Sequence, residues 1–188
     1  MNALRLVEGS SLLDEAAAIA GAADGDPQAR EWLVRRWTPT IWRFCARMVG
    51  DDQDAADITQ EVMLRVLRSL DRYDPSRSFS TWIFGIARNA CIDEHRRRQH
   101  RRTEALDDVA DPAESALTEL SREERARRLR QAVDDLPPMY REVLILFHFE
   151  HLKYTEIAEA LNLPLGTVMN RIFRARQRVR ALLEGEAP

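Results

Sequence analysis

The chain has 188 residues and a formal net charge of −3, and its few glycines among many Ala, Leu, Arg and Glu favour an all-α protein of one or two domains. Cys45 and Cys91 belong to no CxxC pair, which argues against a zinc site or a disulfide framework. No basic-then-apolar leader and no run of about 18 apolar residues occurs, so we predict a cytoplasmic protein without membrane insertion.

Residues 1–21 form a weakly patterned N-terminal lead. Helical spacing begins at Asp26 and Pro27, and Pro39 is expected to bend or interrupt this helix. A second helix, Asp54–Leu70, follows a cluster of aspartates that complements its dipole. Its predicted buried stripe is Ile58, Val62, Val66 and Leu70. The opposite face carries acidic and polar residues around an exposed Leu64, which suits either a docking surface or an ordinary solvated helix.

The segment from Arg72 to Arg98 combines aromatic and basic residues. A polar loop is expected before a helix over Trp82–Arg98. Aromatic rings beside arginines suit single-stranded nucleic acid, because bases stack on rings while arginines contact phosphates. Asn89 has both a donor and an acceptor with which to read a base that has left the duplex. For Phe84 and Ile86 we favour a core role, whereas Tyr73, Phe79 and Trp82 suit either role.

Charge is segregated along the second half of the chain. Residues 88–102 hold six arginines against two acids, and residues 103–124 hold eight acids against one arginine. The acidic stretch 103–121 lacks sustained periodicity and is predicted to be a flexible linker. Two basic surfaces on either side of it suit a protein that holds one polyanion at two places.

The pattern at 154–180 predicts a helix-turn-helix. A short helix with Ile157, Ala158 and Leu161 on one face ends at Asn162 and Pro164, which suit a tight turn and a helix start. The next helix has a predicted buried stripe of Val168, Ile172, Ala175, Val179 and Leu182. Its outer face is rich in arginine and has no acid between Gly166 and Leu183. This arrangement is typical of a reader of the DNA major groove.

The alternatives are a stand-alone helix-turn-helix regulator that binds duplex DNA as a dimer, and a helical adaptor with no nucleic-acid role. His148 and His151 share a spacing that could bind metal, but no further ligand completes a site. No phosphate loop, serine elbow or paired carboxylates occur, so we expect no enzyme activity, no cofactor and no metal.

Four stretches, in this order, resemble extracytoplasmic-function (ECF) sigma factors, promoter-recognition subunits of bacterial RNA polymerase. They are DDQDAADITQEVMLRVLRSL, SFSTWIFGIARNACIDEHRRR, LPPMYREVLILFHFEHLKYTEIAEALNLPLGTV and NRIFRARQRVR. The resemblance implies two small helical domains, a sigma-2-like bundle over 22–102 and a sigma-4-like domain with the helix-turn-helix over 122–184. It also implies binding to the polymerase core through the β′ clamp helices and the β flap, binding to promoter DNA, and control by an anti-sigma factor.

The resemblance further assigns roles to residues. The residues implied to bind the core polymerase are Asp57, Gln60, Glu61, Leu64 and Arg65. Those implied to recognise and help melt the −10 element are Phe79, Ser80, Trp82, Arg88, Asn89, Asp93, Arg96 and Arg97. Those implied to read the −35 element in duplex form are Gly166, Thr167, Met169, Asn170, Arg171, Phe173 and Arg174.

The chain departs from the family pattern at four positions. Met169 stands where Lys or Arg is usual, Asn170 where Ser is common, Lys153 where a capping Ser is frequent, and Asn162 where Gly is usual. A methionine cannot make the bidentate contact to guanine that an arginine makes, a contact worth about 1–3 kcal/mol. The promoter sequence is therefore expected to differ from the usual one.

Overall fold

A computed structural model describes residues 12–104 and 122–184, and within them every regular element is helical. The helices are α1 (Leu12–Ala23), α2 (Pro27–Val49), α3 (Asp52–Arg68), α4 (Phe79–Glu104), α5 (Arg122–Asp134), α6 (Pro138–His148), α7 (Tyr154–Leu161) and α8 (Leu165–Glu184), with a 3-10 turn at Leu70–Arg72. The all-α prediction is confirmed. The predicted linker 103–121 lies outside the described residues, except for the last two residues of α4.

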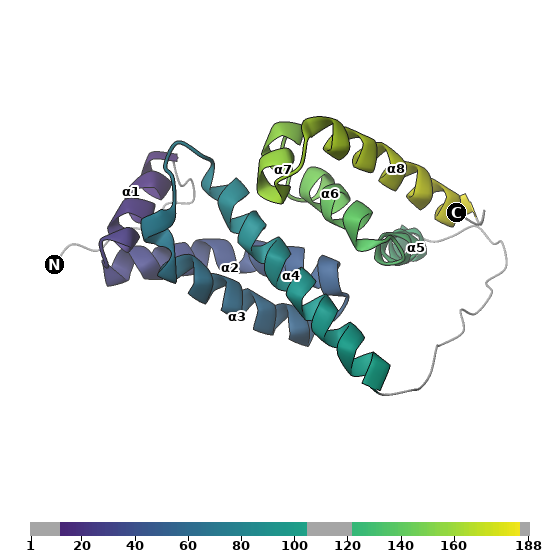
Figure 1. The fold of residues 1–188 in the computed structure, drawn as a ribbon, viewed down its shortest axis with the longest axis horizontal. Helices are drawn as coiled ribbons and strands as arrows, with labels where there is room; N and C mark the ends of the chain where they lie inside the picture. The colour runs from purple at the N-terminus through teal and green to yellow at the C-terminus, as the bar shows by residue number, and fades with distance from the viewer. Residues whose placement is uncertain (1–11, 105–121, 185–188) are drawn as a thin grey trace.

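Helices α1–α4 form an N-terminal bundle and α5–α8 a C-terminal bundle. In Figure 1 the C-terminal bundle lies along one side of α4, and α7 and α6 contact α4 and α2 respectively. A single apolar core runs from Ile19 in α1 to Ile172 in α8, so the two bundles share buried side chains. A smaller cluster of Val133, Leu136, Leu144 and Ala175 holds α5 against α6 and α8.

Helix α2 continues through Pro39, so the expected interruption does not occur. It begins at Pro27, after Asp26 accepts a hydrogen bond from the Gln28 N–H at 2.9 Å, and ends at Gly50 with φ 72°. Pro39 and Arg35, whose carbonyl loses its helical partner, are both exposed, so water can satisfy that carbonyl. Buried side chains on both sides of Pro39 then keep the helix in one piece.

Helix α3 follows its sequence pattern closely. Asp51 caps it by accepting from the Asp54 N–H at 2.8 Å, and acids occupy its first turn. All four residues of the predicted stripe are buried.

Helix α4 is longer than predicted, running over 26 residues from Phe79. Its earlier start is visible in the hydrogen bond from the Trp82 N–H to the Ser78 carbonyl at 3.1 Å. The buried Phe84 meets the ring of Phe44 at 5.3 Å and that of Trp37 at 6.3 Å, both nearly edge to face. These contacts join α4 to α2, which confirms the core role favoured for Phe84.

Replacing Phe84 with Ala should lower the free energy of unfolding by about 3–5 kcal/mol, because it removes a buried ring from between two others. Urea denaturation followed by circular dichroism measures the change. Phe173→Ala is the matched control, since Phe173 is 60% exposed and its loss should cost less than about 0.5 kcal/mol. Equal losses in both variants would contradict the placement of Phe84.

Candidate nucleic-acid interface

The outer face of α3 carries the five residues implied to bind the core polymerase. Asp57, Gln60 and Leu64 are exposed, and Glu61 and Arg65 are half-buried. Leu64, 46% exposed, borders an apolar hollow of about 350 Å³ between α2 and α3, which Trp42 and Met63 also line. An apolar hollow with a polar rim is the ordinary form of a protein-docking surface.

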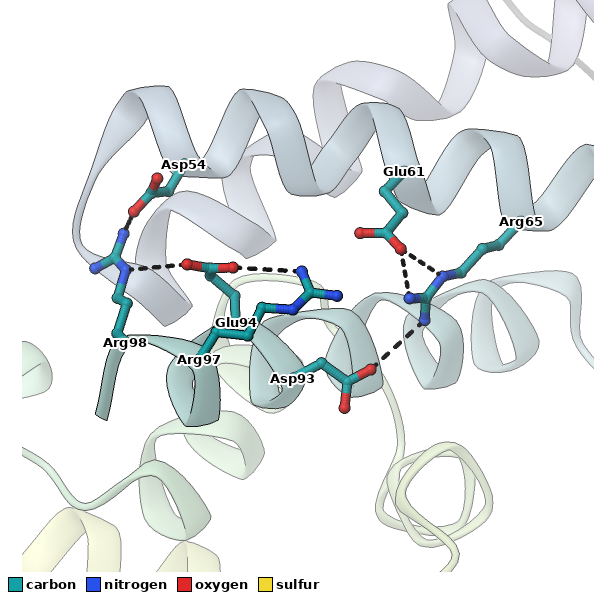
Figure 2. A network of polar contacts seen from close by, with 7 residues as sticks. All are labelled: Asp54, Glu61, Arg65, Asp93, Glu94, Arg97 and Arg98. Atoms are coloured by element: carbon teal, nitrogen blue, oxygen red, sulfur yellow. Dashed lines mark hydrogen bonds and ion pairs between the residues drawn. The ribbon is translucent and has the colours of Figure 1, made fainter. Parts of the chain in front are cut away.

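Ion pairs join this face to α4, as Figure 2 shows. Arg65 pairs with Glu61 at 2.5 Å on its own helix and reaches Asp93 on α4 at 3.8 Å. Farther along, Arg98 pairs with Asp54, and Arg97 lies 3.5 Å from Glu94. Both Asp93 and Arg97 are implied to act at the −10 element. Here Asp93 contacts α3, and Arg97 pairs with an acid on its own helix.

An aromatic cluster lies where the loop enters α4. Tyr73, Phe79 and Trp82 are mutual neighbours, with ring centroids 5.2–5.5 Å apart. Phe79 is only 5% exposed and also meets Trp37 at 5.5 Å, so it forms the floor of the cluster. Tyr73 and Trp82 are half-buried, and burial raises the pKa of the Tyr73 hydroxyl. The rings that remain accessible to a base are therefore Tyr73 and Trp82.

Polar residues follow the aromatic cluster along α4. Ser80, whose hydroxyl lies 2.6 Å from that of Ser78, is half-buried. Asn89 is exposed and accepts a hydrogen bond from Arg88 at 3.3 Å. Arg96 and Arg97 are exposed farther along the helix. The aromatic cluster, the amide of Asn89 and the basic side chains of Arg96 and Arg97 thus follow one another from the preceding loop along α4.

Helices α7 and α8 form the predicted helix-turn-helix. Asn162 adopts the left-handed conformation with φ 51°, as its turn position predicts. The side chain of Lys153 has no acceptor with which to cap α7. Its backbone N–H instead donates to the Glu156 carboxylate at 2.7 Å, which is the second half of a capping box. Val168, Ile172 and Ala175 are buried, whereas Val179 and Leu182 at the far end of the stripe are half-buried.

The outward face of α8 is more apolar than the sequence suggested. Leu165, Met169 and Phe173 lie one turn apart and are 43%, 51% and 60% exposed. Gly166 and Asn170 are exposed beside them, and Thr167 is half-buried. Arg174 is exposed and donates to Asn170 at 3.1 Å. Arg176 and Arg178 lie over aromatic rings of the same bundle, at 5.1 Å from Phe147 and 5.2 Å from Tyr140.

One carboxylate joins the two predicted DNA-reading surfaces. Glu142 on α6, 2% exposed, accepts from Arg88 Nε on α4 at 2.9 Å and from Arg171 Nη1 on α8 at 3.0 Å. Sequence reasoning missed Glu142. The sequence does show one acid directly before the apolar run Val143–Leu146, and a buried charge there is costly unless it has partners.

Neither a metal centre nor a membrane span is found among the described residues. No group of three or more His, Cys, Asp or Glu that could hold an ion occurs within 12–104 and 122–184. No helix in that part of the chain is long and apolar enough to cross a bilayer. His148 accepts from Arg176 at 3.3 Å, and burial together with this arginine lowers the pKa of its imidazole. Cys45 and Cys91 are free and buried.

Two family descriptions match the two bundles. Sigma-70 region 2 matches residues 33–101, and Sigma-70 region 4 matches residues 126–179. The ECF sigma factor SigW of Bacillus subtilis is 35% identical over 173 residues, which cover 85% of this chain and 91% of SigW. The chain belongs to the ECF sigma factor family.

Other sigma factors are similar over most of this chain. SigE of Mycolicibacterium smegmatis is 39% identical over 168 residues, which are 86% of this chain but 65% of the length of SigE. The structure of CnrH in complex with the cytosolic domain of CnrY has a TM-score of 0.70 at 26% identity and covers 92% of this chain and 99% of that one. The RpoE sigma factor of Bartonella quintana shares the fold, with a TM-score of 0.66 at 22% identity, over 82% of this chain and 96% of that one.

Sigma factors provide bacterial RNA polymerase with promoter-specific initiation. The N-terminal bundle of this sigma factor contains region 2, and its C-terminal bundle contains region 4. The family matches therefore fall on the two bundles that carry the aromatic cluster and the helix-turn-helix. Proteins of this family are, in general, regulators of the polymerase rather than enzymes.

Proposed function

We propose that this sigma factor binds core polymerase through the face of α3, recognises and melts the −10 element with α4 and its preceding loop, and reads the −35 element with α8. The single observation that carries the proposal is the pairing of two differently built surfaces. An aromatic cluster followed by an exposed amide on one bundle suits unpaired bases, and a helix-turn-helix on the other suits a duplex. Base stacking and phosphate contacts would supply the free energy of opening without nucleotide hydrolysis.

The core-binding role of α3 is supported by its hollow. Leu64 and Gln60 border apolar space between α2 and α3, and the half-buried pair Glu61–Arg65 stands beside it. We propose that Asp57, Gln60, Glu61, Leu64 and Arg65 dock on the β′ clamp helices. The link from Arg65 to Asp93 would then connect core binding to the helix that faces the −10 element.

The −10 role is divided among the aromatic residues. Tyr73 and Trp82 are the accessible rings, so they would contact the flipped base, while Phe79 holds them in place from beneath. Asn89 would read the base edge, and Arg88, Arg96 and Arg97 would contact phosphates. Ser80 follows Phe79 in the first turn of α4, and Asp93 would orient Arg65.

The −35 role of α8 involves an apolar stripe. Thymine presents a methyl group in the major groove, and apolar side chains contact it. Because Leu165, Met169 and Phe173 are exposed on one side of α8, we propose that they contact thymine methyls. Gly166, Thr167 and Asn170 would allow close approach to the backbone, and Arg171 and Arg174 would contact phosphates or bases.

The proposed partners are core polymerase, including its β flap, promoter DNA and an anti-sigma factor, and the proposed site of action is the cytoplasm. The RpoE structure was solved in complex with the anti-sigma factor NepR. We propose no enzyme activity and no cofactor, because binding free energy is sufficient for the proposed role.

The deciding experiment is open-complex formation on a library of randomised promoters, with and without core polymerase. Permanganate footprinting detects the unpaired thymines. We expect opening only when the sigma factor and core are both present. Sequence-specific duplex binding without any core requirement would favour the stand-alone regulator. Absence of salt-dependent DNA affinity, even with core, would favour the adaptor.

Leu64→Asp should weaken binding to core polymerase at least tenfold, about 1.4 kcal/mol, because it places a charge in the apolar hollow of α3. Fluorescence anisotropy of the labelled sigma factor measures the affinity. Leu165→Asp is the matched control, since Leu165 is similarly exposed at 43% but lies on α8. The same loss of core affinity in both variants would contradict the docking role of α3.

Asn89→Ala should slow promoter opening about tenfold while leaving initial duplex binding within about twofold, because the amide reads an unpaired base edge. Stopped-flow fluorescence of a base analogue in the −10 element separates the two steps. Gln53→Ala, an exposed amide change on α3, serves as the control and should alter neither step. A loss confined to initial binding would assign Asn89 to the closed complex.

Met169→Arg should change the preferred base at one −35 position from thymine or adenine to guanine, with a discrimination of about 1–3 kcal/mol. Selection from a randomised −35 element and sequencing of the selected promoters reveals the preference. Gln177→Arg adds the same charge two turns farther along α8 and should leave the preference unchanged. An unaltered preference in Met169→Arg would mean that this side chain faces no base.

A further inference from the structure

The two bundles that would read the promoter pack closely against each other in the free chain. A Cβ atom placed on Gly85, in the second turn of α4, would lie 3.1 Å from the carbonyl oxygen of Ala160 on α7. Only a glycine allows this approach without displacement of the neighbouring backbone. The shared apolar core and the contacts of α2 with α6 continue the interface on both sides.

Within residues 12–104 and 122–184, three ion pairs cross this interface, and in each of them the arginine belongs to the N-terminal bundle. Arg47, Arg77 and Arg88 of the N-terminal bundle pair with Glu150, Glu159 and Glu142 of the C-terminal bundle, respectively. Arg47 also lies over the ring of Phe149, 4.3 Å from its centroid. The C-terminal bundle therefore presents carboxylates to arginines of the N-terminal bundle, and one of these arginines, Arg88, belongs to the proposed −10 surface.

The pair at Glu142 is the most enclosed of the three. The side chain of Glu142 is 3% exposed, whereas that of Glu159 is 33% exposed. Each of the two carboxylate oxygens of Glu142 accepts a hydrogen bond from a different helix. A buried carboxylate is costly unless charged donors surround it, and here the donors are Arg88 and Arg171. These arginines belong to the proposed −10 and −35 surfaces, and their side chains are only 25% and 19% exposed.

Arg141, the residue before Glu142, adds a hydrogen bond to a backbone carbonyl across the same interface. Its Nη1 donates to the carbonyl of Met48, near the C-terminal end of α2, at 2.8 Å. Its Nη2 donates to Leu136 at 3.0 Å within its own bundle. Adjacent residues of α6 thus hold α2 and α4 at once.

We propose that Glu142 is an intramolecular latch: it takes the place of DNA phosphates on Arg88 and Arg171 and keeps the free sigma factor closed. The inference rests on the proposed function, because it concerns control of the same two DNA-binding surfaces. Since both partners belong to one chain, the latch acts at a high effective concentration. Binding of core polymerase or of promoter DNA must separate the bundles before Arg88 can contact a phosphate.

The test uses the full chain with dyes on Gln53→Cys and Gln177→Cys, two exposed uncharged positions on α3 and α8. Cys45 and Cys91 are buried and should not react with the dyes. Energy transfer reports the separation of the bundles, and anisotropy of a labelled random-sequence duplex reports DNA affinity without core polymerase. Both are measured at one fixed salt concentration.

Glu142→Gln should lower energy transfer and tighten duplex binding about tenfold, with a steeper salt dependence as Arg88 and Arg171 become available. Glu31→Gln is the charge-matched control, because it breaks an exposed pair with Arg35 at 2.7 Å within α2. It should change neither readout by more than about twofold. Equal gains in both variants would mean that net charge alone is responsible and would overturn the latch.

Gly85→Leu opens the interface without touching a charged group and guards against misfolding of the C-terminal bundle in Glu142→Gln. A leucine side chain would press on the carbonyl of Ala160, which a Cβ atom alone would already approach to 3.1 Å, whereas leucine is a good helix former within α4 itself. We expect lower energy transfer and tighter duplex binding in this variant too. Unchanged energy transfer in both variants, or opening with no gain in duplex affinity, overturns the proposal.

Failure of the proposed function gives a different result. In that case no variant binds duplex DNA at any salt concentration, although energy transfer still falls in Glu142→Gln and Gly85→Leu. That result would retain Glu142 as a contact between bundles and overturn its role in controlling DNA binding.

Discussion

The rest of the structure depends on the burial of α4 on two sides, against α2 and against α7. One side inserts Phe84 between the rings of Trp37 and Phe44, which holds α4 to α2. The other side packs against α7 at Gly85, where a Cβ atom would lie only 3.1 Å from the carbonyl oxygen of Ala160. The polar residues of α4 are therefore restricted to the positions that remain, and these include Asn89 and Arg96. Burial of α4 thus determines which of its side chains can meet DNA.

Charge then decides how the two bundles are arranged. Apolar packing is nondirectional, so it draws the bundles together without specifying a register. A buried carboxylate is directional, because its two oxygens must both be satisfied. At Glu142 this is achieved only when Arg88 and Arg171 converge from separate bundles. The residues suited to bind phosphate are the ones available to neutralise an internal acid, so stability of the closed chain and access to DNA are coupled.

Much of the fold could be predicted from local patterns. The buried stripe of α3, the aspartates at its start and the left-handed Asn162 all follow from spacing and residue type, and the structure confirms them. The interruption expected at Pro39 does not occur, because the free-energy cost of this proline depends on whether water reaches the carbonyl of Arg35, and that is a tertiary property. Phe79 could not be assigned to pocket or core, because its burial depends on Trp37, 42 positions earlier in the chain.

By itself, the sequence determined most of the helices, the family and a set of candidate residues for promoter contact, because these depend on short-range periodicity and on motifs. Only the tertiary structure decided which of those residues are free. It turned Arg88 and Arg171 inward, left Leu165, Met169 and Phe173 exposed, and introduced Glu142 between the bundles. The physical reason is that burial and charge compensation are set by partners on other helices, and spacing along one helix carries no record of them.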